Sequence, residues 1–230
     1  MIDLAPDPLS VFAYSHLPQR FKMQRQIDAR TLPDAAERIA ILKCVIDRLT
    51  EGGYVYIGMD HFSLPSDELA LAQRNGTLHR NFQGYSTHAD CDLIGLGVSA
   101  LGCVGNVYAQ NEKNIERYEA ALARNELPLA RGIRLTADDA LRREIISRLM
   151  CDFRLRFSEI NIRYGVDFTR YFARELEGLR ALEWDGLLSV DGEGIVVHPP
   201  GRLLIRNVCM SFDRYLRSAN VASATYSRTV

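Results

Sequence analysis

A short apolar run that ends abruptly in polar residues constrains the fold of this 230-residue chain more than any other feature. The run Tyr54–Gly58 predicts a buried strand, and it passes directly into Met59-Asp60-His61-Phe62. In α/β folds, ligand-handling residues gather in the loop after the carboxyl end of a strand. A second polar and aromatic cluster, His79–Tyr85, follows a short predicted helix. Together the two clusters predict a functional site.

Strands and helices alternate in the first half of the chain, which predicts the α/β class. We expect a strand at Leu9–Tyr14, a helix from Pro33-Asp34 to about Thr50, and then the strand Tyr54–Gly58. Strand, helix, strand in this order is typical of a parallel sheet. The remaining elements expected in this half are a helix at Ser66–Arg74, a buried glycine-rich strand at Leu93–Ala100 and an amphipathic helix at Asn111–Asn125.

A boundary is predicted near Ala130–Leu135, which divides the chain into residues 1–131, residues 132–217 and a tail at 218–230. Thr136–Asp139 resembles a capping box, and an apolar residue follows at every fourth position from Leu141 to Phe153. The later elements expected are helices at Phe157–Tyr164, Asp167–Leu182 and Pro200–Arg217, with a hairpin of Leu187–Val190 and Ile195–His198 between the last two. This order predicts a small, mostly helical, winged-helix-like α+β domain.

Composition excludes several classes of function. From Thr136 to Arg217 the 13 arginines are balanced by 13 acidic residues, which argues against a nucleic-acid surface. The start of the chain lacks the basic and apolar regions of a signal peptide, and no window approaches the roughly 18 apolar residues of a membrane span. The lack of a span predicts no membrane partner. Because the five cysteines are dispersed, we expect a reducing, cytoplasmic location.

Several polar residues are candidates for chemistry. The Gln83 amide suits a nucleotide-like or amino-acid ligand, although an ordinary polar loop explains it equally well. Asp60 and His61 form either an acid–base pair or a turn cap beside a structural histidine. The metal-ligand types His61, His79, His88, Asp90 and Asp92 lack a spacing that places two ligands on one helical face, so no metal site is expected. A substrate that bears several carboxylates would suit the basic residues Arg20, Lys22, Arg25 and Arg80. The alternative for each of them is an ordinary solvated surface residue.

The chain resembles oxygen-independent coproporphyrinogen III oxidases, which are radical S-adenosylmethionine enzymes. Besides Tyr54–Thr87, the blocks that carry the resemblance, in the family's order, are Leu9–Pro18, Gly95–Ala100, Tyr108–Asn111, Ile145–Phe153 and Gly201–Asn207. The resemblance implies that residues 1–131 are the late part of a partial TIM-like barrel with its extension, followed by the C-terminal domain as a cap. The family's Cys-x3-Cys-x2-Cys motif is missing, because no two cysteines in this chain are closer than twelve residues.

The resemblance also implies a reaction and its components. A [4Fe–4S] cluster cleaves S-adenosylmethionine to a radical that takes hydrogen from propionates of coproporphyrinogen III, and loss of carbon dioxide and an electron leaves vinyl groups. Residues matching Ser15 and Gln83 belong to the family's second S-adenosylmethionine site, and a residue matching Leu101 to the first. Arg20, Arg25 and Arg80 would then hold substrate carboxylates. The implied partners are an N-terminal barrel half with the cluster and an electron donor, in an enzyme that is monomeric when complete. The alternative is a non-enzymatic tetrapyrrole-binding module, or the partner of a separately encoded cluster-bearing half.

Overall fold

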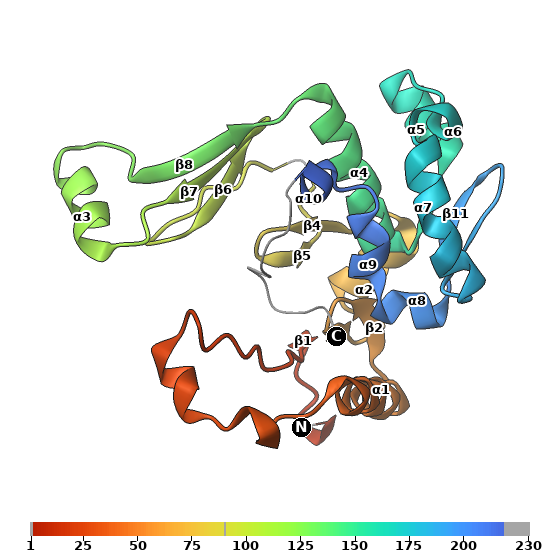
Figure 1. Cartoon of the computed structure of the whole chain (residues 1–230), viewed down its shortest axis with the longest axis horizontal. Helices are drawn as coiled ribbons and strands as arrows, with labels where there is room; N and C mark the ends of the chain where they lie inside the picture. The colour runs from red at the N-terminus through yellow and green to blue at the C-terminus, as the bar shows by residue number, and fades with distance from the viewer. Residues whose placement is uncertain (1, 90, 219–230) are drawn as a thin grey trace.

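The computed structural model describes residues 2–89 and 91–218. The N-terminal part of the chain forms a small sheet flanked by one long helix (Figure 1). Strands β1 (Leu9–Ser10), β2 (Val55–Gly58) and β3 (His61–Ser63) lie in the order β1-β3-β2. Each pair is antiparallel, so the parallel pairing expected from the sequence is wrong. The physical reason is the two-residue link between β2 and β3, which permits only an antiparallel hairpin. The predicted strand Leu9–Tyr14 pairs only at its first two residues.

Helix α1 (Ala35–Glu51) begins where the sequence predicts, because Asp34 and Glu37 form a reciprocal capping box. Only Leu49 on its apolar face is fully buried, and Ile39 is 47% exposed. Before α1 the described chain forms β1 and three short 3-10 turns, at Ile2–Leu4, Lys22–Gln26 and Ala29–Thr31. The helix therefore covers the sheet at one end and leaves apolar surface open at the other.

The polar cluster His79–Tyr85 forms a β-hairpin. Helix α2 (Glu68–Asn75) ends at Gly76, which adopts the left-handed conformation expected of a helix stop. Strands β4 (His79–Asn81) and β5 (Gly84–Ser86) then pair antiparallel. Phe82 and Gln83 make the turn between them, so Gln83 lies in a hairpin turn and not in an open loop after a helix.

A second antiparallel sheet projects from the body of the molecule as an arm that ends in α3 (Figure 1). It is built from β6 (Leu101–Val104), β7 (Val107–Asn111) and β8 (Leu129–Arg134), with α3 (Ile115–Ala123) between the last two. The expected helix Asn111–Asn125 is thus shorter, since Asn111 ends β7. The expected domain boundary at Ala130–Leu135 lies largely within β8.

The glycine-rich segment Leu93–Ala100 is not the buried strand that its apolar sequence predicts. Only Leu93 pairs, in one bridge to Cys103, and Leu96 is 86% exposed. The close backbone approach expected for this segment is found at Gly95, where a Cβ would lie 2.7 Å from the Leu101 carbonyl oxygen, but not at Gly97, where a Cβ would meet nothing within 4 Å. The side chain of Asn111 holds the segment by donating to the carbonyls of Gly95 and Gly97, at 2.9 Å each.

The C-terminal part contains the largest core among the described residues. Its central helix α4 (Ala137–Asp152) packs against β2, β4, β9 (Arg154–Arg156), α5 (Phe157–Tyr164) and α9 (Ile205–Met210) (Figure 1). The predicted stripe is confirmed, since Leu141, Ile145, Leu149 and Phe153 are all buried. The strands β9 (Arg154–Arg156), β10 (Leu188–Val190) and β11 (Gly194–Val197) form the sheet β10-β11-β9. The surrounding helices are α5 (Phe157–Tyr164), α6 (Phe168–Tyr171), α7 (Ala173–Trp184), α8 (Pro199–Leu203), α9 (Ile205–Met210) and α10 (Arg214–Ser218).

The structure corrects the predicted C-terminal helices in one respect. The single helices expected at Asp167–Leu182 and Pro200–Arg217 are divided into two and three segments. The hairpin β10–β11 lies where it was predicted, and the tail from residue 219 onward falls outside the described residues. No helix in the described ranges is long and apolar enough to cross a bilayer.

Candidate functional site

The link between β2 and β3 is a tight turn in an unusual conformation. Gly58, Met59 and Asp60 have φ values of 133°, 47° and 72°, so three consecutive residues lie in the left-handed half of the backbone map. Two-residue hairpins with positive φ at both central positions match the twist of their strands, but methionine is uncommon there. Non-glycine residues in such conformations cost free energy and cluster at functional sites. The turn presents Asp60 and His61 in a fixed orientation.

His61 is held in one tautomer by the turn. Its Nδ1 lies 2.8 Å from the Met59 carbonyl oxygen, and because a carbonyl only accepts hydrogen bonds, Nδ1 carries the proton. The ring makes edge-on contacts with Phe12 and Tyr85, at centroid distances of 5.8 and 5.2 Å. Nε2 faces Gly84, where an added Cβ would come within 3.4 Å of it. The Nε2 of His61 therefore points at β5.

Asp60 is a half-buried carboxylate beside several cations. Burial raises the pKa of its carboxyl above the ordinary value, and the charges of Arg206, His61 and Arg80 act in the opposite direction. Its side chain makes no hydrogen bond to the part of the chain that the structure describes, so the alternative that Asp60 is a turn cap has no support in the contacts. A carboxylate in this setting can bind a proton or orient a cationic neighbour.

Two arginines from distant parts of the chain converge on this turn. The Arg80 guanidinium, from β4, lies over the Tyr85 ring at 5.2 Å, and its Nη1 is buried without a hydrogen-bond partner among the described residues. Arg206, from α9, donates from Nε to the Met59 sulfur at 3.5 Å, a weak acceptor. Both guanidinium groups therefore retain donors for an anionic ligand. We call Asp60, His61, Arg80, Tyr85 and Arg206 the Asp60 cluster.

Buried tyrosines support the Asp60 cluster from behind. Tyr85 donates its hydroxyl hydrogen to the Met150 carbonyl oxygen at 3.0 Å, and burial raises its pKa well above the ordinary value. Burial, with the Asp60 charge, also raises the pKa of Tyr56 to about 12. Both tyrosines are neutral at physiological pH and act as fixed dipoles and aromatic walls.

The three residues assigned to S-adenosylmethionine by resemblance lie on separate elements. Ser15 is exposed in the N-terminal segment, where its carbonyl oxygen accepts from Gln24 at 3.0 Å. Gln83 is exposed in the β4–β5 turn, held by its backbone N–H donating to Asn81 Oδ1 at 2.8 Å, and its side-chain amide is free of partners in the described chain. Leu101 begins β6, opposite Gln110 of β7. Open, polar positions such as Ser15 and Gln83 are compatible with a nucleotide-like ligand.

The structure separates the arginines expected to hold carboxylates. Arg20 and Arg25 are exposed in the N-terminal segment together with Lys22, and Arg25 donates from Nε to the Pro18 carbonyl at 2.9 Å. Arg80 belongs instead to the Asp60 cluster. The sequence reasoning missed Arg206, although it lies in the block Gly201–Asn207; its distance of 147 positions from Met59 hides their contact.

The cysteines do not fit an iron–sulfur cluster. All five are free, with Cys44 and Cys91 exposed and Cys151 and Cys209 buried. Burial raises the thiol pKa of Cys151 to about 12, whereas a cluster ligand must be a thiolate. Across residues 2–89 and 91–218, no three His, Cys, Asp or Glu side chains are arranged to hold a metal ion, and Asp90 of the metal hypothesis lies outside these ranges.

Comparisons with known proteins agree with the fold. Residues 135–204 match the family model of the HemN C-terminal domain. The chain superimposes with a TM-score of 0.89 on a solved structure described as coproporphyrinogen III oxidase (HemN) from Escherichia coli, a radical SAM enzyme. The two sequences are 50% identical, and the match covers 93% of this chain and 49% of the solved one. The class of protein defined by these matches is the C-terminal region of a HemN-type protein.

The curated relatives narrow this class to one family. A protein of Pseudomonas aeruginosa named oxygen-independent coproporphyrinogen III oxidase is 49% identical to this chain, over 96% of this chain and 48% of the relative. A protein of the same name from Thermostichus vulcanus is 46% identical, over 99% of this chain and 70% of the relative. The chain belongs to the oxygen-independent coproporphyrinogen III oxidase family. It spans about half the length of most of the curated relatives it matches.

Proposed function

We propose that this chain is the C-terminal half of an enzyme that oxidatively decarboxylates two propionates of coproporphyrinogen III without oxygen, giving protoporphyrinogen IX. The observation that carries the proposal is the similarity at 49% identity along 96% of the chain to a protein with that name. The Asp60 cluster supports it, because a substrate with several carboxylates suits the guanidinium groups of Arg80 and Arg206, which act on Asp60 electrostatically but form no salt bridge within the described residues.

In this proposal a [4Fe–4S] cluster, held by an N-terminal segment outside this chain and supplied with electrons by a separate donor, would provide the radical chemistry together with S-adenosylmethionine. The residues of this chain bind and orient: Gln83 and Ser15 offer polar groups to S-adenosylmethionine, and Leu101 offers apolar contact. The complete enzyme is proposed to be a monomer in the cytoplasm, which accords with the five free cysteines.

The Asp60 cluster is proposed to hold a substrate carboxylate. Arg80 presents its buried Nη1 and Arg206 presents the donors that Met59 does not use. A carboxylate bound bidentately at one of these guanidiniums is oriented as well as neutralised. His61 is fixed by the turn, and its Nε2 makes no hydrogen bond within the described residues, so it is available to the bound group. Arg20 and Arg25 remain candidates for carboxylates farther out.

The test uses the chain joined to a family N-terminal segment that carries the cysteine motif. Product formation, iron content and melting temperature are compared for the unaltered protein and Gln83→Ala. We expect turnover to fall at least about a hundredfold, because displacement of a reacting centre by about an ångström has that effect. Iron content and melting temperature should not change, since Gln83 lies exposed in its turn.

Gln26→Ala is the matched control, because Gln26 is also exposed and its side chain has no hydrogen-bond partner in the described residues. Full activity of Gln83→Ala removes Gln83 from the site. A lowered melting temperature assigns it a structural role. Absence of product from the joined, iron-loaded protein contradicts the proposed function and favours a non-enzymatic tetrapyrrole-binding module.

A further inference from the structure

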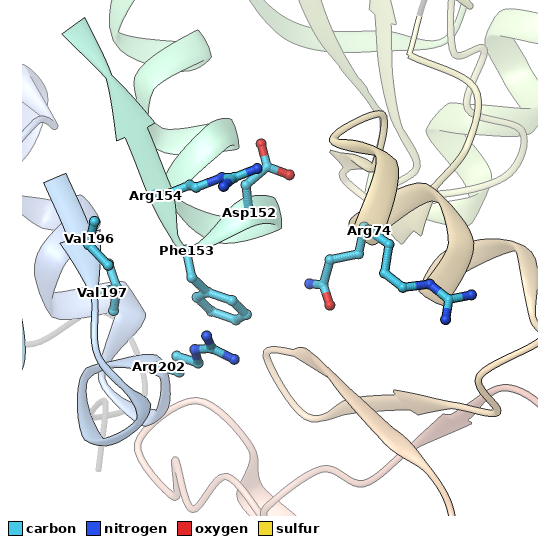
Figure 2. Close-up of a pocket in the computed structure, with 8 residues that line it drawn as sticks. Arg74, Asp152, Phe153, Arg154, Val196, Val197 and Arg202 are labelled. Atoms are coloured by element: carbon cyan, nitrogen blue, oxygen red, sulfur yellow. The ribbon is translucent and has the colours of Figure 1, made fainter. Parts of the chain in front are cut away.

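A cavity of about 290 Å³ lies between α2, the end of α4, the edge of the β9–β11 sheet and α8. Three arginines line it, Arg74, Arg154 and Arg202, together with one acid, Asp152 (Figure 2). The volume is at the small end of the range for ligand pockets, so it suits a ligand of few atoms and not a whole nucleotide. The excess of arginine indicates an anion.

The four charged residues differ in whether they already have partners. Asp152 is ion-paired with Arg148 at 2.9 Å, and Arg74 donates to the Pro65 carbonyl oxygen at 2.8 Å, with its side chain directed away from Phe153 (Figure 2). The side chains of Arg154 and Arg202 form neither hydrogen bond nor ion pair with any residue that the structure describes. The two guanidinium groups that line this cavity therefore have no hydrogen-bonded acceptor in the described residues, and Arg154 interacts with the Asp152 carboxylate only electrostatically.

Arg202 is positioned for an anion by its surroundings. Its guanidinium carbon lies 4.8 Å from the centroid of the Phe153 ring, and its Nε is buried without a partner among the described residues. A face-on contact with an aromatic ring leaves the N–H groups at the edge of the guanidinium free to donate. Arg154 extends from the other side of the Phe153 ring, and both side chains reach toward α2 (Figure 2).

The wall opposite Arg154 and Arg202, formed by α2, is held in place by hydrogen bonds. Gln73 of α2 donates from Nε2 to the carbonyls of Ile57 and Cys151, at 2.7 and 2.8 Å, which ties α2 to β2 and to the end of α4. A cavity whose walls are cross-linked in this way is preorganised, so binding does not require the chain to become ordered.

We propose that this cavity binds a small oxyanion, a carboxylate or a phosphate, through Arg154 and Arg202. The planar fork of each guanidinium matches two oxygens of such a group, and the bond supplies the acceptor that the buried Arg202 Nε lacks. The site is separate from the positions assigned to S-adenosylmethionine and does not depend on the proposed function.

Isothermal titration calorimetry of the 230-residue chain tests this with sodium phosphate and sodium succinate, at ionic strength held constant with chloride. One saturable site is expected. Arg154→Ala and Arg202→Ala should each weaken binding at least tenfold, and Arg202→Lys should retain part of it because the charge remains without the fork. Arg156→Ala is the control on the same strand, since Arg156 already pairs with Glu159 at 3.4 Å.

Saturation by phosphate alone or by succinate alone supports the site and identifies its ligand class. No saturable binding of either probe overturns the proposal, as does an Arg154→Ala affinity equal to that of the unaltered chain. Circular dichroism verifies folding. If Arg202→Ala unfolds because Phe153 loses its cover, Arg154→Ala, at an exposed position, decides the question.

Discussion

The turn at the end of β2 leaves no room for a side chain at Gly58, and this gives a quantitative prediction. A Cβ at this position would lie 2.6 Å from Tyr85 Oη and 2.9 Å from Phe153 Cζ, and φ is 133°. The backbone conformation costs an alanine about 1–3 kcal/mol, and forced overpacking costs about 1–3 kcal/mol more. We expect Gly58→Ala to lower the free energy of unfolding by about 2–6 kcal/mol, measured by urea denaturation with circular dichroism.

Gly53→Ala separates the two contributions. Gly53 also has positive φ, at 89°, but a Cβ there would meet nothing within 4 Å, so only the backbone cost of about 1–3 kcal/mol remains. Adding Tyr85→Phe to Gly58→Ala removes the nearest clashing atom, and the double variant should lose less stability than the two single changes added together. Equal destabilisation by Gly58→Ala and Gly53→Ala would refute the close contact of β2 with Tyr85 and Phe153.

Three further changes test other parts of the structure. Leu149→Ala, at a fully buried position of α4, should cost about 2–5 kcal/mol in urea unfolding. Thr136→Ala removes the cap of α4, whose Oγ1 accepts from the Asp139 N–H at 3.2 Å, and should cost about 0.5–2 kcal/mol by the same measurement. Asp60→Asn should raise stability at pH 7, because the raised pKa of Asp60 means that its ionised form is disfavoured in the folded protein. This gain should disappear as the pH falls below about 3.9, where Asp60 is protonated in both states; a gain that persists there contradicts the assignment.

Local signals in the sequence predicted α4 and α5 well. The capping residues Thr136 and Asp139 and the apolar stripe of α4 act within one helix, so neighbouring residues suffice to specify them. Helix α5 was predicted with its observed bounds, Phe157–Tyr164. The single helix expected after Pro200 is three segments, because short-range periodicity does not report the turns at Leu204 and Ser211–Asp213 that separate α8, α9 and α10.

Long-range pairing could not be predicted in the same way. An apolar run such as Tyr54–Gly58 indicates a strand but does not give its direction relative to a neighbour, so the antiparallel β2–β3 hairpin was missed. The segment Leu93–Ala100 has the composition of a buried strand, yet Ile94 is 74% exposed. Leu96 and Val98 of this segment are also exposed, at 86% and 41%. Such a surface is consistent with a chain that spans about half the length of its relatives.

The candidate site shows most clearly what a sequence alone leaves out. Asp60 and His61 were recognisable because they follow a strand, and Arg80 because it lies in a polar and aromatic cluster. Arg206 instead contributes from a helix that is adjacent only in the folded chain. Met59 explains the connection: its side chain is buried in the C-terminal core, and its sulfur accepts from Arg206. The strained turn is thus held by the packing of the C-terminal part. The C-terminal part therefore fixes the conformation in which Asp60 and His61 are presented.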